Sequence, residues 1–240
     1  WTGYIAVVNA LCVRRGIPCP MLDRPGRFLL LFPASALFWW FFEFLNRFVQ
    51  NWYYLGVDIF GPTGYVVFAS LAFSTVLPAV LSTHAFLRTF PALDKGLTGL
   101  QPISPARPRI IAGLSLLSGG TGLMFIGIWP DHLFPLLWVA PLLIFCALQT
   151  LSGRQNIFSP LRRGDWRNVA VPALAALTCG FFWEMWNLKS LSGWEYAIPF
   201  VNRFPVFKMP VAGYGGYLPF GLECLVIGQI ILRPGRTARN

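Results

Sequence analysis

Long apolar runs separated by short charged connections dominate the chain. A helix needs roughly 17–25 apolar residues to cross a bilayer, and six runs reach that length. These runs cover about 28–46, 64–87, 110–129, 133–150, 169–187 and 211–232. A shorter apolar stretch, 1–13, stops at Arg14 and Arg15, and we expect it to be the inner end of a helix whose first residues are missing. The pattern predicts an all-α integral membrane protein with seven transmembrane helices, the first of them truncated.

The positions of the basic residues test this helix count. Fifteen of the 19 Lys and Arg residues fall in the connections after predicted helices 1, 3 and 5 and in the C-terminal tail, and the other four fall on the opposite side. Cytoplasmic loops of membrane proteins are enriched in Lys and Arg. The C-terminus is therefore predicted to be cytoplasmic and Trp1 to lie on the outer side. We expect 1–240 to form a single transmembrane domain in a bacterial inner membrane.

A polar signature occurs twice near the outer ends of apolar runs. Glu43 and Asn46 in the second predicted helix match Glu184 and Asn187 in the sixth, 141 positions further on. Each pair is spaced i, i+3, so its two side chains share one face of the helix. A Trp-x-Tyr segment follows each pair, at an offset of 142 positions. This order of uncommon residue types indicates an internal duplication.

A second recurring element extends the duplication. Leu77-Pro78 recurs as Leu218-Pro219, again 141 positions further on. The second and sixth predicted helices cross in the same direction, so the two repeats are parallel. Repeats of this kind often place binding sites between them. The spacing predicts a 3+1+3 plan, with repeat 1 over about 1–87, a linking helix at about 110–129 and repeat 2 over about 133–232.

Three carboxyl groups lie at apolar helix positions, on Glu43, Glu184 and Glu223. Ionisable groups inside a membrane are costly and are functional candidates by default. A carboxyl in an apolar pocket can act as a general acid or stabilise a cation, so these three residues are the candidate catalytic groups, with Asn46 and Asn187 orienting them. A second interpretation stays open, in which Glu and Asn hydrogen-bond across helices and only lock the repeats together.

Aromatic residues gather at the predicted outer ends of the helices. Trp and Tyr are enriched at membrane interfaces, so a lipid-facing belt is one interpretation. The other is the rim of an apolar ligand cavity, where ring faces stabilise a nearby cation. A glycine-rich segment, 213–220, opens the last helix and permits either close packing or a broken helix that lines a site. The candidate ligand-binding residues, besides the two Asn, are Trp52, Tyr54, Trp183, Trp186, Trp194, Tyr196, Tyr214 and Tyr217.

Composition excludes several classes of protein. Charged residues make up 12% of the chain, against about 25% in soluble domains. The net charge of +10 is spread over loops and forms no single patch, so no nucleic-acid partner is expected. The five cysteines form no CxxC pair and are interpreted as buried, inert thiols. His84 and His132 lie on opposite predicted sides, so neither a metal site nor a cofactor is expected.

The duplicated signature resembles that of the small membrane lycopene cyclases, which consist of two homologous three-helix parts. In that family a helical acid precedes an outer Trp-x-Phe/Tyr segment, and a later helix carries Pro followed by paired acids. The paired acids are incomplete in this chain, because no acid follows Pro78 and a single one follows Pro219. The resemblance implies a shared architecture; activity is a separate matter. The residues that carry it are Glu43, Trp52-Tyr53-Tyr54 and Pro78 in one half, and Glu184, Trp194-Glu195-Tyr196, Pro219 and Glu223 in the other.

These patterns predict a polytopic inner-membrane protein with an intramembrane acid and aromatic site. Its expected ligand is an apolar isoprenoid-like molecule, a pigment or a lipid, and its enzymatic form would be cyclase-like or isomerase-like. The alternative is a non-catalytic accessory subunit of a larger membrane complex, photosynthetic or respiratory, that contacts lipid, pigment or partner helices. A transporter ranks third, because few intramembrane polar groups are available to line a water path. Membrane lipids are expected partners in each case.

Overall fold

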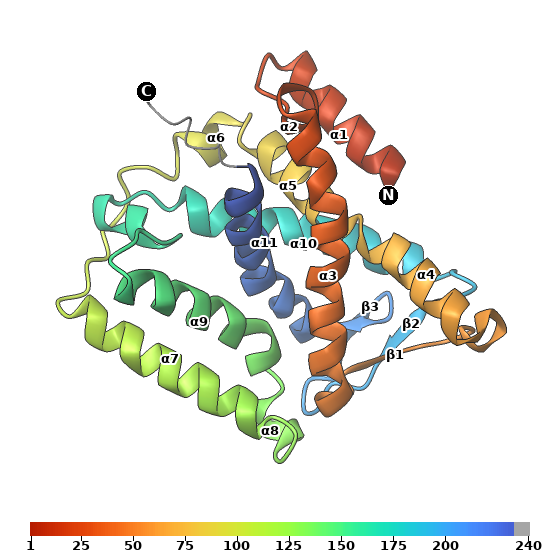
Figure 1. The fold of residues 1–240 in the computed structure, drawn as a ribbon. Coiled ribbons are helices and arrows are strands. Elements are labelled where there is room, and N and C mark those ends of the chain that lie inside the picture. Colours follow the sequence, from red (N-terminus) through yellow and green to blue (C-terminus); the bar gives the residue numbers. More distant parts are fainter. Residues whose placement is uncertain (233–240) are drawn as a thin grey trace.

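Helices form most of the computed structural model, which describes residues 1–232 (Figure 1). Four helical segments are long and apolar enough to cross a membrane. They are α3 (Pro25–Val49), the segment Asp58–Leu87 that contains α4 and α5, α10 (Arg167–Asn187), and the segment Val211–Leu232 that ends in α11 (Tyr217–Leu232). The all-helical, multi-pass character predicted from the apolar runs is therefore confirmed at the level of these four segments.

Shorter elements connect these segments. Six α-helices of the described chain have proline as their first or second residue, where the missing N–H has no intrahelical partner to lose. Two of the shorter helices, α1 and α9, are apolar along their length. The remaining helices are α1 (Thr2–Arg14), α2 (Pro20–Asp23), α6 (Pro91–Asp94), α7 (Pro108–Phe125), α8 (Pro130–Leu133) and α9 (Leu136–Leu151), and the strands are β1 (Trp52–Tyr54), β2 (Trp194–Tyr196), β3 (Pro205–Val206) and β4 (Met209–Pro210).

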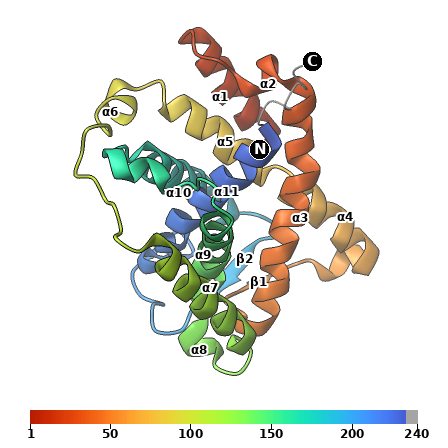
Figure 2. The same ribbon diagram turned by 60° about the vertical axis from the view of Figure 1, so that its left-hand side comes forward.

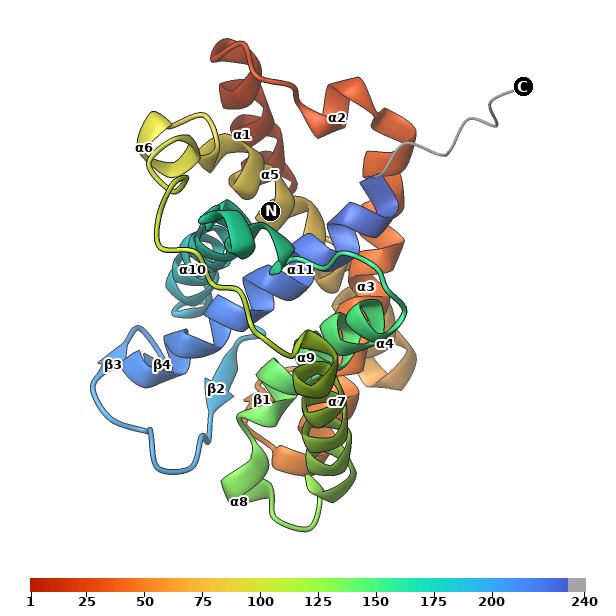
Figure 3. The ribbon, with the colours of Figure 1, turned by 90° about the vertical axis from the view of Figure 1, so that its left-hand side faces the viewer.

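Four helices pack around one core. α10 lies against both α11 and α5, and α3 lies against α5 and α11. Figure 3 shows α11 running obliquely between α10 and α3. α1 packs on α5, α9 packs on α11, and α7 lies beside α9 at the edge of the molecule (Figures 1 and 2). The core therefore lies where the α3–α5 pair meets the α10–α11 pair.

The apolar run 64–87 does not form the single helix predicted from its length. It is divided into α4 (Gly61–Phe73) and α5 (Val76–Leu87), with the break at Ser74 and Thr75. Pro78 has no N–H to donate to the carbonyl one turn earlier, which weakens the helix at this point. Ser35 of α3 bridges the break, because its Oγ donates to the Phe73 carbonyl at 2.5 Å and accepts from the Leu77 N–H at 2.9 Å.

The second Leu-Pro pair has the same position in its helix. Pro219 is the third residue of α11, as Pro78 is the third residue of α5. A 3₁₀ helix, Val211–Gly216, precedes α11 where α4 precedes α5. In both places the proline lies in the first turn, where it costs no intrahelical hydrogen bond. The recurring pair therefore marks the start of a straight α-helical segment.

The connections at one end of the helices are held by polar contacts. Asp94 accepts from Arg88 and also lies 3.3 Å from Arg167, which pairs with Asp165 at 2.8 Å. The Arg88 guanidinium lowers the pKa of Asp94 below its ordinary value. Backbone hydrogen bonds from Leu100 to Gly164 and from Trp166 to Leu97 join the two loops. The Pro-rich connection after α5 is thus anchored to the start of α10.

Replacing the bridging serine, Ser35→Ala, is expected to lower the free energy of unfolding by about 1–2 kcal/mol, because a buried N–H and a buried carbonyl lose their partner. Thermal unfolding in detergent, followed by size-exclusion chromatography, measures the change. Ser118→Ala on the exposed face of α7 is the matched control, since its hydroxyl bonds only within its own helix. Equal melting temperatures for the two variants would show that the bridge is not needed.

Candidate functional site

Two three-residue strands bring together the ends of α3 and α10. β1 pairs antiparallel with β2 in the register Trp52↔Tyr196, Tyr53↔Glu195 and Tyr54↔Trp194. Trp52 and Trp194 occupy matching places in the two Trp-x-Tyr segments, as do Tyr54 and Tyr196. The Trp of each segment therefore pairs with the Tyr of the other segment, and the Tyr53–Glu195 pair lies at the centre of the ladder. The pairing is isologous, as at a two-fold interface between identical partners.

The two asparagines fasten these strands to their helices in the same way. Asn46 Nδ2 donates to the Trp52 carbonyl at 2.7 Å, and its Oδ1 accepts from the backbone N–H of Asn51 at 2.8 Å. Asn187 Nδ2 donates to the Trp194 carbonyl at 2.7 Å, and its Oδ1 accepts from the Trp194 N–H at 2.8 Å. Both side chains are almost fully buried. They satisfy backbone groups of the segments that follow the two helices, so the asparagines hold the strands and do not contact the carboxyl groups.

The carboxyl group of Glu43 is surrounded by aromatic donors. Its Oε1 accepts from the Tyr54 hydroxyl at 2.5 Å and from the indole N–H groups of Trp52 and Trp39, both at 3.0 Å. Burial raises the pKa of Tyr54 well above its ordinary value of 10, so this phenol remains a donor at neutral pH. Two of the three side chains of β1, Trp52 and Tyr54, thus donate hydrogen bonds to Glu43 of the preceding helix α3.

Glu184 has a closely related environment in the other half. Its Oε1 accepts from the Tyr196 hydroxyl at 2.6 Å and from the Tyr217 hydroxyl at 3.0 Å. The Trp194 indole N–H donates to the Tyr196 oxygen at 2.6 Å, which extends the chain of hydrogen bonds. Burial raises the pKa of Tyr196 well above 10. Glu184 is fully buried, and its Oε2 has no partner among the described residues.

One difference between the two carboxyl environments is the position of a large side chain; the other is that the Trp52 indole donates to Glu43 directly, whereas the Trp194 indole donates to Tyr196. Trp39 precedes Glu43 by one helical turn, and the residue at the matching place before Glu184 is Gly180. A Cβ atom on Gly180 would lie 2.4–2.6 Å from ring atoms of Tyr217. Tyr217 therefore fills the space above Gly180, whereas Val76 stands at the corresponding place in the first half. Glu43 therefore accepts a hydrogen bond from Trp39 of its own helix, α3, whereas Glu184 of α10 accepts one from Tyr217 of the next helix, α11.

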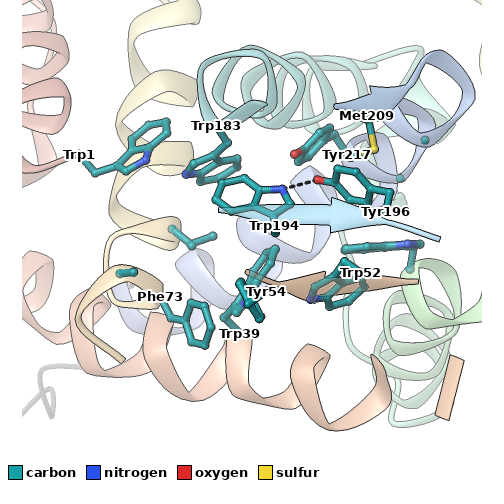
Figure 4. A pocket seen from close by; sticks show the side chains of 15 residues that line it. Trp1, Trp39, Trp52, Tyr54, Phe73, Trp183, Trp194, Tyr196, Met209 and Tyr217 are labelled. Carbon is teal, nitrogen blue, oxygen red and sulfur yellow. Dashed lines mark hydrogen bonds between the residues drawn. The ribbon is translucent and has the colours of Figure 1, made fainter. Parts of the chain in front are cut away.

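An apolar cavity of about 230 Å³ lies between the two halves (Figure 4). Side chains from both Trp-x-Tyr segments line it, with Trp39 and Phe73 on one side and Tyr217 and Met209 on another. The carboxyl groups are not part of this lining; they lie behind the phenols and indoles that donate to them. The candidate ligand-binding residues that line the cavity are Trp52, Tyr54, Trp183, Trp194, Tyr196 and Tyr217.

Three candidate residues lie elsewhere. Trp186 is 43% exposed and packs on Trp1. The Tyr214 hydroxyl donates to the Val206 carbonyl at 3.1 Å. Glu223 is buried against α9, where its Oε1 accepts from the Leu142 N–H at 3.0 Å. The sequence analysis grouped Glu223 with Glu43 and Glu184 as candidate catalytic acids, but Glu223 faces α9 and lies apart from the cavity.

Trp39, one of the aromatic residues at the predicted outer helix ends, lines the cavity and lies four residues before Glu43. Several other lining residues were missed by the sequence patterns. Trp1, Phe73, Trp138 and Met209 also line the cavity, and no local pattern singles them out. Trp138 of α9 stacks on Phe42 at 5.3 Å, which only the packing of α9 against α3 brings about.

The described residues 1–232 contain no cluster of three His, Cys, Asp or Glu side chains that could hold a metal ion. The five cysteines are buried and unpaired. The salt bridges in this part of the chain use Asp94, Asp165 and Glu195, and none involves Glu43, Glu184 or Glu223. The donors to the two cavity carboxyls are therefore neutral.

No protein-family model, curated protein or solved structure matches the chain.

Gly180→Ala is expected to lower the free energy of unfolding by about 1–3 kcal/mol, because the new methyl group overlaps the Tyr217 ring. Thermal unfolding measures the loss. Gly120→Ala in α7 is the control, since a Cβ there meets no atom within 4 Å. The cost should shrink when Tyr217→Val is also present, as in the first half, because neighbouring substitutions are not additive. If Gly180→Ala destabilises the protein equally with and without Tyr217→Val, the Tyr217 ring is not the group that excludes a methyl group at position 180.

Proposed function

We propose that the cavity binds the end group of an apolar isoprenoid-like or lipid ligand, and that the two carboxyl–phenol units beside it supply acid–base chemistry of the cyclase or isomerase type. The observation that carries this proposal is the convergence of two related Glu–Tyr hydrogen bonds, of 2.5 and 2.6 Å, on one aromatic cavity. A lining that is mostly apolar with a few convergent polar groups is typical of small-molecule sites.

The size of the cavity supports an end group as the ligand. Pockets for drug-sized molecules measure about 300–1,000 Å³, and this cavity measures about 230 Å³. A whole long-chain lipid therefore does not fit inside it. Ala72 of α4 lines the cavity and is itself exposed, which leaves a side where a tail can extend toward the surrounding lipid.

The two units support a reaction that needs no added reagent. For an alkene ligand, the carboxyl of the first unit starts protonated and that of the second unit starts ionised. The tyrosine of the first unit turns its O–H from the carboxyl to the ligand, delivers the proton to one alkene carbon and takes the carboxyl proton in its place. The resulting carbocation either accepts the electrons of a second double bond, which closes a ring, or is deprotonated as it stands. In the last step a C–H next to the cation loses its proton to the tyrosine oxygen of the second unit, and the hydroxyl proton of that tyrosine passes to the ionised carboxylate. Each turnover moves one proton from the first carboxyl to the second, so the second unit is the acid in the next turnover. The product is an isomer of the substrate, and nothing is oxidised or reduced.

The proposed membrane arrangement has seven helices in the 3+1+3 plan, with the C-terminus cytoplasmic and the first residue outside. The matching hydrogen bonds of Asn46 and Asn187 support a duplication. The packing of α1 on α5 and of α9 on α11 also supports it, because α5 and α11 are the last helices of the two proposed repeats. Asn9 of α1 bonds to Ser82 at 2.7 Å. Leu142 of α9 bonds to Glu223, which stands 141 positions after Ser82.

A cavity-filling variant tests ligand binding. Gly216 lines the cavity, and a Cβ there lies at an ordinary 3.5 Å from the Trp138 ring, so Gly216→Leu should fill the space without breaking the fold. Mass spectrometry of lipids extracted from the purified protein should then show loss of the bound species. The control is Gly215→Leu, since the neighbouring Gly215 is exposed and has no atom within 4 Å of a Cβ. Equal lipid retention in both variants would contradict binding in this cavity.

A second experiment tests the acid. Glu184→Gln keeps a hydrogen-bond acceptor for Tyr196 and Tyr217 but has no proton to give, so isomer formation should fall by at least about 100-fold while ligand retention persists. The assay incubates the protein with the isoprenoid lipid extract of the expressing cells and measures products of unchanged mass. Glu195→Gln, at an exposed acid of β2, is the control. Loss of folding instead of turnover would assign Glu184 a purely structural role.

A further inference from the structure

The aromatic side chains around the cavity keep few hydrogen-bond donors for a ligand. The polar ends of Trp39, Trp52 and Tyr54 all donate to Glu43, and those of Tyr196 and Tyr217 donate to Glu184. The Trp194 indole N–H is also occupied, by the Tyr196 oxygen. What these six residues present to the cavity is ring surface. A ligand group that needs hydrogen bonds gains little here.

The electrostatic character of this surface favours positive charge. The faces of aromatic rings carry the negative part of the ring quadrupole and attract cations within about 6 Å. Two carboxyl groups stand directly behind the rings, and no Lys or Arg of the described residues forms a salt bridge with either. A hydrogen bond from a phenol to a carboxyl group also increases the electron density of the ring. The cavity therefore has the properties of an aromatic cage for a cation.

The position of the cavity fits a head group better than a tail. Its lining includes residues of β1 and β2, which follow α3 and α10, and Met209 and Gly213, which precede α11. The site thus extends from Ala72 and Phe73, at the break between α4 and α5, to the strands that follow α3 and α10, and a head group at the strand end would have room for its tail at Ala72. Trp183 stacks on Tyr217 at 6.1 Å, and its indole N–H has no hydrogen bond within the described residues, so its ring is not tied to either carboxyl group.

We propose that the cavity binds a quaternary ammonium group, specifically a trimethylammonium group carried on an apolar tail. A trimethylammonium group has no N–H to satisfy and bears its charge on an apolar surface, which matches a lining made mainly of ring faces. A choline-type lipid head and a free quaternary ammonium compound share this chemistry. The proposal rests on the proposed function in that the cavity is a ligand site, but it does not depend on the acid–base step.

The test titrates the full chain in nanodiscs of phosphatidylglycerol and phosphatidylethanolamine, which contain no choline. The probes are choline, hexyltrimethylammonium, and 3,3-dimethyl-1-butanol, which is the neutral isostere of choline, with binding measured by calorimetry. Choline should bind at least about tenfold more tightly than the isostere. Hexyltrimethylammonium should bind more tightly than choline if the natural ligand is a lipid, and equally if it is a free compound.

Variants locate the binding. Trp183→Leu removes a ring face without removing a hydrogen bond and should weaken choline binding at least about fivefold, while Trp183→Phe should weaken it less. Trp129→Leu is the control, because Trp129 is 56% exposed and does not line the cavity. Size-exclusion chromatography verifies that each variant is folded.

The outcomes separate this proposal from the preceding one. If the neutral isostere binds as tightly as choline, and Gly216→Leu abolishes both, the cavity is an apolar site and the preference for a cation is wrong. If choline binds but Trp183→Leu and Trp129→Leu behave alike, binding lies elsewhere and the aromatic cage is wrong. If no probe binds and Gly216→Leu retains the same lipids as the wild type, both proposals fail.

Discussion

The antiparallel pairing of β1 with β2 is the constraint on which the site depends. Three-residue strands are too short to be stable alone, and their backbone groups need partners wherever they are buried. Asn46 and Asn187 supply two bonds each from the helices, and the strands supply the rest to one another. Because each strand carries a Trp and a Tyr on either side of its central residue, pairing them places four aromatic side chains around one space.

The buried carboxyl groups are stabilised by the same arrangement. An acid inside an apolar helix is costly unless hydrogen bonds satisfy it, and the phenols of the strands provide these bonds to Glu43 and Glu184. The bonds hold each strand against its helix and, when no ligand is bound, direct the O–H and N–H groups of these side chains to the carboxyl groups. Structural locking and the formation of an apolar, aromatic cavity are therefore two results of one set of hydrogen bonds. The chemistry of the cavity is set by which atoms these bonds leave free.

The surroundings of Glu43 and Glu184 are similar but not equivalent. The bulky donor beside the carboxyl is Trp39 in one half and Tyr217 in the other, and Gly180 leaves the room that Tyr217 needs. Ser82 of α5 bonds to Asn9 of α1, whereas Glu223, at the matching position of α11, bonds to Leu142 of α9. Glu223 thus belongs to the packing of α9 against α11.

The sequence by itself determined the helical class, the four long apolar segments and the approximate ends of most helices, because length and hydropathy are local properties. It also identified both Glu–Asn pairs and the Trp-x-Tyr segments, since their spacing is short. The break at Ser74 and Thr75, the contribution of Trp138 and Met209 to the cavity, and the separation of Glu223 from the other acids were decided only by the tertiary structure. Each depends on a partner far along the chain, such as Ser35 for the break and α9 for Glu223. Local patterns predict which residues are unusual, but the packing of distant helices decides which of them meet.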